Sequence, residues 1–419
     1  MCRITTGELV TSATTVAPAL TTPEVPPAAS RRIQSVDAIR GLIMIIMALD
    51  HIRDFVNSSA MAFLPTDLDH TTAPVFLTRW ITHFCAPVFA FTAGTSAFLW
   101  ARRRTKAQLS RFLLSRGLWL ILLELTVLRF ILFLNFSYHD TLIVVLVIWM
   151  LGLSMVAMAG LVHLPARWLA ALSIVTIAAH NLLDPIGADR FGSFAWLWNI
   201  LHEPGTFRSY GDTIHVAYPL IPWVAVMALG YCFGPVLFWD PARRRRFLVR
   251  LGLGLIVAFF VLRGLNVYGD PAPWSHQSSH LFTALSFLNC TKYPPSLLFL
   301  LMTLPPALLA MAWLERVRLS AENPIIVFGR VPFFYYVVHL AVIHAVAIVL
   351  GFLRYGKASF LLLPPPSMGS AMDAFPANYG YSLWFVYAVW VAVIVMMYPM
   401  CRWFAHLKQR RHDWWLSYL

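Results

Sequence analysis

Ten long apolar stretches constrain this chain more than any other feature of its sequence. A helix rises 1.5 Å per residue, so about 20 apolar residues cross the roughly 30 Å hydrocarbon core of a bilayer. Of the 419 residues, 59% are hydrophobic and only 12% are charged, which excludes an ordinary soluble domain. The sequence predicts an all-α, polytopic integral membrane helix bundle with about ten transmembrane helices. The stretches lie near residues 37–56, 75–100, 117–135, 141–163, 166–182, 215–238, 248–267, 295–314, 325–352 and 380–402.

Basic residues predict how this bundle lies in the membrane. With a cytoplasmic amino terminus, about 21 of the 32 Lys and Arg residues fall on the cytoplasmic side and about 8 outside. Because cytoplasmic loops are rich in Lys and Arg, we expect both termini to be cytoplasmic. The same distribution accounts for the formal charge of +13, so we expect no nucleic acid partner. The long outer loops at 183–214, 268–294 and 353–379 either grip a substrate or only connect helices.

The chain divides into a membrane domain and two tails. Residues 1–30 lack the apolar core of a signal peptide and are rich in Thr, Ala and Pro, which predicts a disordered cytoplasmic tail. Residues 31–404 form the predicted transmembrane domain, and residues 405–419 form a basic and aromatic cytoplasmic tail. The five cysteines form no C-x-x-C pair, and no carboxylate accompanies His276 and His280. We therefore expect neither a disulfide framework nor a metal site.

The first apolar stretch carries ionisable residues at both ends, in DAIRGLIMIIMALDHIRDF (37–55). At 100° per residue, Arg40 and His51 lie on nearly the same helical face, and Asp37 and Asp54 fall within about 40° of it. The helical rise separates Arg40 and His51 by about 16 Å, so we expect them to bracket one cavity. Ionisable groups inside a bilayer are costly and usually face the bundle interior, where they mark a pathway or a reaction site.

A histidine on this polar face of the helix suggests group transfer. Neutral His51 can take a proton near pH 7, and a neighbouring carboxylate orients such a ring and stabilises its cation. Asp54, one turn beyond His51, is the predicted orienting group, and Asp50 is the weaker candidate because it points about 100° away. Asp50, Arg53 and Asp54 have a second interpretation as interfacial residues at the end of the helix.

Stretches along most of the chain resemble a single family. They are SVDAIRGLIMIIMALDHIRDF (35–55), FCAPVFAFTAGTSAFLW (84–100), YPLIPWVAVMALGY (218–231), GRVPFFYYVVHL (329–340) and RWFAHLKQRRHDWWLSYL (402–419). Together they resemble the bacterial relatives of heparan-alpha-glucosaminide N-acetyltransferase. The spacing from Arg40 to His51 is similar to the R-x10-H signature of the wider transmembrane acyltransferase superfamily.

The resemblance implies that residues 31–404 are a transmembrane acyltransferase domain in a bacterial inner membrane. An acyl group would pass from acetyl-CoA, or another cytoplasmic acyl-CoA, to an acceptor at or beyond the membrane, with His51 as the central catalytic residue. Arg40 lies toward the cytoplasmic side, where it can meet the pantetheine or phosphate part of the donor. The resemblance does not identify heparan sulfate as the acceptor.

GRVPFFYYVVHL supplies a second predicted wall of the cavity. Tyr336 lies one turn before His339 and shares its face, while His83 lies near the outer end of the second stretch. Each histidine has a structural alternative, as a core side chain bonded to a neighbouring helix. The predicted substrate-binding residues are Asp37, Arg53, His83, Arg330, Tyr336 and His339.

Three further groups have two interpretations each. Glu124 and Arg129 are predicted to pair with Asp37, Arg40 or another intramembrane charge, unless they serve the site. The Arg clusters at 102–104 and 243–246 either bind CoA phosphates or only set the orientation of the helices. Aromatic residues of the outer segments suit either sugar stacking or the bilayer interface. These aromatic residues are Trp196, Trp198, Tyr210 and Trp274.

We therefore expect an acyl-CoA-dependent membrane acyltransferase that acts on a hydroxyl or amine, with His51 as general base or acyl carrier. The alternative is a proton-coupled transporter or lipid-handling permease, in which the buried Asp, Arg and His residues form a relay. A scaffold of an envelope assembly is a third possibility. The acceptor, the acyl chain length and the oligomeric state do not follow from the sequence.

Overall fold

A computed structural model describes residues 34–134, 136, 142–209, 211–363, 372–411, 413 and 416. The tail predicted at 1–30, Arg31, Arg32 and Tyr210 lie outside the described residues, as does part of the tail predicted at 405–419. Residues from Gln34 onward form one compact unit.

The described chain is mostly helical. The α-helices are α1 (Gln34–Val56), α2 (Ala73–Thr82), α3 (Cys85–Ala101), α4 (Lys106–Leu123), α5 (Arg129–Phe133), α6 (Val147–Leu161), α7 (Ala166–Ala179), α8 (Ala195–Leu201), α9 (Leu220–Phe233), α10 (Pro241–Leu265), α11 (His280–Leu288), α12 (Leu297–Leu314), α13 (Pro324–Arg330), α14 (Pro332–Tyr355) and α15 (Leu383–Arg410). A π-helical turn, η2 (Glu124–Leu128), joins α4 to α5. The other short helices are η1 (Ser58–Met61), η3 (His180–Leu183), η4 (Ala188–Phe194), η5 (Gly234–Phe238), η6 (Ser359–Leu362) and η8 (Met372–Ala374).

The predicted all-α membrane bundle is confirmed. Each of the ten predicted stretches contains a helix, and within the described chain seven segments are long and apolar enough to cross a membrane. The protein is therefore a multi-pass membrane protein. The seven segments are Ala73–Ala101, Ala166–Leu183, Leu220–Phe238, Pro241–Leu265, Leu297–Leu314, Pro332–Tyr355 and Leu383–Arg410.

Two predicted stretches differ in detail from the structure. The stretch at 141–163 begins with a strand, β1 (Leu142–Val145), which pairs in parallel with β3 (Asp212–Val216), while β2 (Gly205–Ser209) pairs with β3 in antiparallel fashion. This small sheet lies in regions predicted to be helix and irregular loop. The stretch at 325–352 is broken into α13 and α14 at Val331, because Pro332 disfavours helical geometry in the residue before it.

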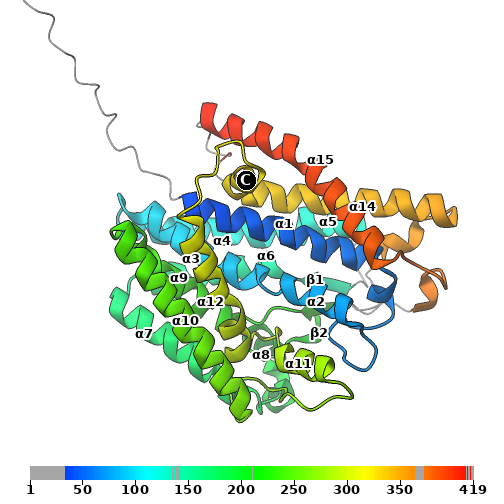
Figure 1. The fold of residues 1–419 in the computed structure, drawn as a ribbon, viewed down its shortest axis with the longest axis horizontal. Coiled ribbons are helices and arrows are strands. Elements are labelled where there is room, and N and C mark those ends of the chain that lie inside the picture. The colour runs from blue at the N-terminus through cyan, green and yellow to red at the C-terminus, as the bar shows by residue number, and fades with distance from the viewer. Residues whose placement is uncertain are drawn as a thin grey trace, which may run out of the picture. The chain divides into compact units, whose positions relative to one another are not determined.

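Helix α1 lies at the centre of the packing. In Figure 1 it crosses the bundle with α14 and α15 on one side and α2, α3 and α12 on the other, and it contacts all of these helices. It also packs along α13. Its buried residues are apolar around most of its circumference, which is typical of a helix enclosed by others. Among the charged residues of α1, Asp37 and Arg53 are buried inside the protein.

Glycines allow α1 and α13 to touch through their backbones. A Cβ atom on Gly41 would lie 1.7 Å from the carbonyl oxygen of Ile325, and one on Gly329 would lie 1.8 Å from the carbonyl oxygen of Asp37. Helices inside a membrane gain contact area when small residues permit such close approach. The two glycines therefore fix the position of α13 against α1.

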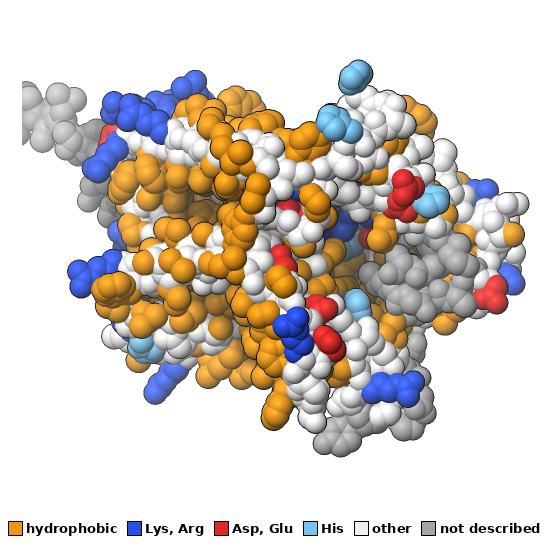
Figure 2. Space-filling view, turned by 90° about the horizontal axis from the view of Figure 1, so that it is seen from below, with side chains coloured by type: hydrophobic (Ala, Val, Ile, Leu, Met, Phe, Trp, Pro, Cys, Tyr) orange, Lys and Arg blue, Asp and Glu red, His pale blue; other side chains and the backbone are white. Residues whose placement is uncertain are grey.

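Charge is distributed unevenly over the protein surface. Figure 2 shows Lys and Arg side chains along one edge, a broad apolar area beside them, and acidic side chains farther across the face. An apolar area of this kind matches the seven apolar helical segments, which bury only 17% to 61% of their most apolar windows inside the protein. The unburied remainder of these apolar helices is typical of a surface that faces lipid.

Replacing Gly41 with valine should disrupt the bundle, because the new side chain collides with backbone atoms that cannot rotate away. We expect a loss of stability on the order of 2 kcal/mol, or failure to fold. Thermal unfolding in detergent measures this. Gly254→Val is the control, since a Cβ on Gly254 meets nothing within 4 Å. Equal stability of the two variants would contradict the close packing of α1 on α13.

Candidate active site

A cavity of about 560 Å³ lies at the carboxyl end of α1. Its wall combines residues of α1, α2, η2 and α14 with the segments around Thr66, Ala217 and Thr291. Four polar residues that line it come from four different helices. These are His51, Arg79, Glu124 and Tyr336. The cavity is large enough for a small substrate and is rich in ionisable groups.

His51 is part of a pair of histidines. Its ring centroid lies 5.3 Å from that of His339 and 6.4 Å from that of Tyr336. His339 is fully buried behind the cavity wall, and its Nδ1 lies 2.9 Å and 2.6 Å from the carbonyl oxygens of Tyr335 and Tyr336. Because carbonyl oxygens only accept, this nitrogen donates. The Nε2 of His339 has no hydrogen-bond partner among the described residues, which leaves an acceptor in the ring beside His51.

Asp50 joins α1 to α2 by a dense set of contacts. Its carboxylate oxygens lie 2.7 and 2.6 Å from Nη1 of Arg79, and one of them lies 2.9 Å from Nη2 of Arg53. The hydroxyl of Thr82 donates to the same carboxylate at 2.9 Å. Two cations and a hydroxyl thus satisfy a carboxylate that lies at the bundle interior.

Asp54 occupies the more open end of the same turn. It accepts a hydrogen bond from Nη2 of Arg53 at 2.6 Å, and its side chain is 36% exposed. In the described part of the chain, neither Asp50 nor Asp54 forms a hydrogen bond to the His51 ring. The structure therefore does not bring the predicted orienting carboxylates into direct contact with His51, and its nearest ring neighbour is His339.

Arg40 is not among the residues that line the cavity at His51, so the structure does not show the shared cavity that the sequence predicts. Nη2 of Arg40 donates to the Thr92 carbonyl oxygen at 3.2 Å and to the Ser96 hydroxyl, both on α3. Arg40 also lies 3.6 Å from Asp37, at the opposite end of α1 from His51. Met44 and Met47 follow Arg40 on the same helical face and are buried, so apolar side chains separate the two residues along α1.

The other predicted site residues divide between the two ends of α1. His83 and Tyr336 line the cavity, and the His83 ring lies 5.3 Å from that of Phe299. Arg330 does not line the cavity. It is the last residue of α13 and follows Gly329, which packs against Asp37. Its side chain donates to the Ala321 carbonyl oxygen. The structure thus brings together the predicted residues near the carboxyl end of α1 and separates them from those near its amino end.

Glu124 lines the cavity but has a different partner from the one predicted. Its carboxylate accepts from the backbone N–H of Leu146 at 3.0 Å and of Trp149 at 3.3 Å, at the start of α6. The prediction that it pairs with an intramembrane charge is therefore wrong. A helix amino terminus carries unsatisfied N–H groups and partial positive charge, which suits a carboxylate.

Sequence reasoning missed three residues of the cavity wall: Arg79 on α2, Lys292 and Tyr293. Lys292 and Tyr293 belong to the segment between α11 and α12 and come into the wall only through the fold. The Tyr293 hydroxyl lies 3.4 Å from Arg79 Nη2 and donates to Tyr218 at 3.3 Å. Burial opposes ionisation of Tyr293, yet the adjacent Lys292 and Arg79 cations hold its pKa below the ordinary value.

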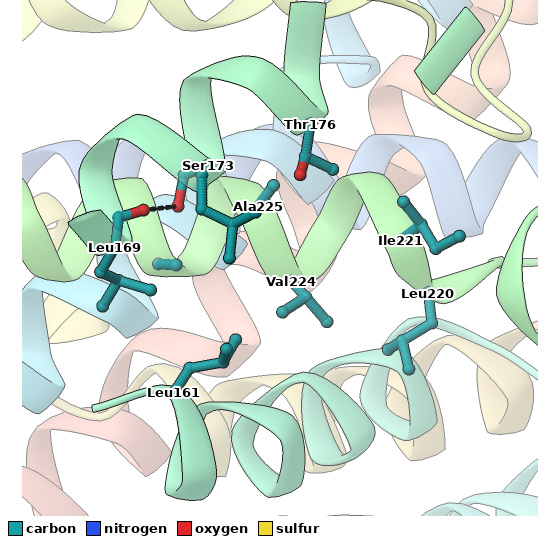
Figure 3. Close-up of a pocket in the computed structure, with 10 residues that line it drawn as sticks. Leu161, Leu169, Ser173, Thr176, Leu220, Ile221, Val224 and Ala225 are labelled. Atoms are coloured by element: carbon teal, nitrogen blue, oxygen red, sulfur yellow. Dashed lines mark hydrogen bonds between the residues drawn. The ribbon is translucent and has the colours of Figure 1, made fainter. Parts of the chain in front are cut away.

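A second cavity has a different character. Figure 3 shows it between α6, α7 and α9, and its volume is about 210 Å³. Its lining is almost entirely apolar, and the hydroxyl of Ser173 donates to the Leu169 carbonyl oxygen. This cavity has no ionisable group in its lining, whereas the cavity at His51 has several.

Asp50→Asn should destabilise the protein strongly, because it leaves two guanidinium groups in the interior without their shared charge partner. We expect a loss of about 3 kcal/mol, which thermal or denaturant unfolding in detergent measures. Arg402→Ala is the control, since Arg402 and Glu322 form an exposed ion pair and such pairs contribute little. A stable Asp50→Asn protein would show that Asp50 does not hold α1 to α2.

Comparison with known families agrees with this architecture. Residues 32–268, more than half of the chain, match the family described as heparan-alpha-glucosaminide N-acetyltransferase, catalytic. The matched region contains His51, Arg79 and Glu124, whereas Lys292, Tyr336 and His339 follow it. No curated protein matches the chain. The chain belongs to the heparan-alpha-glucosaminide N-acetyltransferase catalytic family and is a membrane acetyltransferase by that membership.

Proposed function

We propose that this protein moves an acyl group, with acetyl as the first choice, from acyl-CoA to a hydroxyl or amine of a sugar or other envelope acceptor. The observation that carries the proposal is the position of His51 in the wall of a polar cavity, beside the buried His339. Such a cavity admits a substrate and presents an imidazole to it. The family name supports acetyl as the group and an amine as one acceptor class.

Two chemical routes use His51. As a general base, it takes the proton of the acceptor nucleophile while that nucleophile attacks the thioester carbonyl; the C–S bond breaks and CoA leaves as thiolate. As an acyl carrier, its nitrogen forms a C–N bond to the acyl carbon as the C–S bond breaks, and the acceptor then attacks the acyl-imidazole. In both routes the thiolate is protonated after it leaves.

Neighbouring residues support His51 without touching the reacting atoms. His339 is a positioning residue in this proposal. Two carbonyl oxygens hold its Nδ1 as the donor, which leaves its Nε2 as an acceptor in the ring beside His51. An N–H of His51 that turns toward this acceptor would keep its other nitrogen directed at the substrate. A positive His51 is also attracted by the charges of Asp50 and Asp54.

The donor approaches from the cytoplasmic side in this proposal, and both termini lie there in a bacterial inner membrane. The gathering of Lys and Arg along one edge in Figure 2 supports the orientation. The guanidinium carbon of Arg102 lies 3.7 Å from the ring centroid of Phe238, which precedes the second Arg cluster in the chain. Together they offer a surface for CoA phosphates.

His51→Ala should abolish transfer while the protein remains folded. We expect a fall of at least about 100-fold in the rate of acyl transfer, because general acid–base catalysis supplies that much or more. The measurement is CoA thiol release together with transfer of labelled acetyl to envelope glycans and lipids, identified by mass spectrometry. His163→Ala, at an exposed position outside the cavity, should keep wild-type activity.

Two results would contradict the proposed function. Transfer by a folded His51→Ala protein at the wild-type rate would remove His51 from the chemistry. Proton-driven uptake of a solute into vesicles, with no release of CoA thiol from acetyl-CoA, would favour the transporter alternative.

A further inference from the structure

Helix α1 presents two different faces to the cavity at His51. At 100° per residue, Phe55 lies about 40° from His51 round the helix. Asp50 lies about 100° and Arg53 about 160° from His51. All four residues line the cavity. Asp50 forms an ion pair with α2, so the charged face of α1 points toward that helix, while the rings of His51 and Phe55 both contact rings of α14.

Three helical segments repeat one step from a polar to an apolar residue. In each, a polar residue that lines the cavity is followed about one helical turn later by an apolar residue that also lines it. The pairs are His51 and Phe55 on α1, Tyr336 and Leu340 on α14, and Glu124 and Leu128 on η2, with Leu132 a further turn along in α5. The Glu124 carboxylate is already bonded to backbone N–H groups of α6. Beyond these polar residues, the wall formed by the three segments is therefore apolar.

Contacts among the helices place these apolar residues on the same side of His51. The His51 ring centroid lies 5.3 Å from that of His339, and the Phe55 ring centroid lies 5.1 Å from that of His344. Helices α1 and α14 therefore run in the same direction here. Nδ1 of His344 lies 2.5 Å from the carbonyl oxygen of Ile131 in α5. The apolar parts of α1, α14 and α5 thus meet next to the imidazole.

This apolar side is longer than an acetyl group needs. In the proposed function the thioester carbonyl lies at His51, so the part of the acyl group beyond that carbonyl reaches the neighbouring apolar residues. Acetyl has a single methyl group there, whereas one helical turn spans about 5.4 Å. Leu128 and Leu132 extend the apolar wall over a further turn. A longer acyl chain would bury additional methylene groups, and each one contributes about fourfold in affinity.

The opposite wall of the cavity suits the other substrate. Asp50, Arg79 and Tyr293 bond to one another there, and an alkyl chain placed against them would remove water from charged groups without replacing it. The acceptor hydroxyl or amine is polar and suits this wall. The acyl tail is the apolar part of the reacting groups, so it matches the side formed by α5 and α14.

We propose that the apolar side of the cavity is an acyl-tail subsite, which takes straight-chain acyl groups longer than acetyl, such as butyryl and hexanoyl. Its residues are Phe55, Leu128, Leu132 and Leu340. This inference rests on the proposed function and names its donor class: short- and medium-chain acyl-CoA in addition to acetyl-CoA. The four residues set specificity for the acyl group and take no part in bond making.

Binding of acyl-CoA to the full-length His51→Ala protein in detergent tests the inference without catalysis. The probes are acetyl-CoA, butyryl-CoA and hexanoyl-CoA, and calorimetry gives the dissociation constants, with protein-free micelles as the blank. We expect affinity to rise with chain length. Hexanoyl-CoA should bind at least about tenfold more tightly than acetyl-CoA, because it carries four more methylene groups into the subsite.

Substitutions in the wall separate the subsite from general partitioning into the micelle. Leu132→Trp fills the subsite and should remove the preference for hexanoyl-CoA, whereas Leu132→Met conserves the volume and should retain it. Leu118→Trp adds the same ring at a position of α4 that is 55% exposed, and should leave the preference unchanged. Unfolding curves check that each variant is folded. Leu340→Phe fills the subsite from α14 and takes the place of Leu132→Trp if that variant does not fold.

Three results would overturn the inference. The first is equal affinity for acetyl-CoA and hexanoyl-CoA, and the second is a preference for hexanoyl-CoA that survives in folded Leu132→Trp. The third is tighter binding of hexyl glucoside than of methyl glucoside without any preference among the acyl-CoA probes, which would assign the apolar side to the acceptor. Failure of the proposed function would look different, because the wild-type protein would then release no CoA thiol from any probe while the chain-length preference in binding persisted.

Discussion

The contact of Asp50 with Arg53 and Arg79 is the interaction on which the rest of the structure depends. Three charged side chains in a bundle with an apolar exterior are tolerated only if they satisfy one another, because an unpaired charge there costs several kcal/mol. The pairing ties the end of α1 to α2 and orients the turn that carries His51. The charged groups that stabilise the fold therefore also build the wall of the site.

Close packing at the other end of α1 has a different physical origin. Gly41 and Gly329 let α1 and α13 approach through their backbones, and Arg40 donates to α3. These contacts hold the amino end of α1 in place by close packing. The polar residues of α1 thus perform two tasks, structural at the amino end and chemical at the carboxyl end, with buried methionines between them.

The cavity places the His51 imidazole among charged groups of both signs. His51 lies beside a histidine whose acceptor nitrogen is buried. Arg53, Arg79 and Lys292 share the cavity wall with Asp50, Asp54 and Glu124. In the proposed reaction, the imidazole acts on the acceptor within this set of charged groups.

The sequence by itself determined the helical membrane fold and the placing of His51 on a polar face of the first stretch, because apolar length and helical period are local properties of the chain. The grouping of His51 with Tyr336 and His339 was expected from the family resemblance. It did not determine that Arg40 would be separated from His51, since the packing of Met44 and Met47 depends on neighbouring helices. Nor could it predict that Arg79, Glu124 and Lys292 would meet at one cavity, or that residues 142–145 would form a strand with a segment 70 residues away. Tertiary structure decided these features, because a charge or a strand in the bundle finds its partner across the fold, where sequence spacing carries no information.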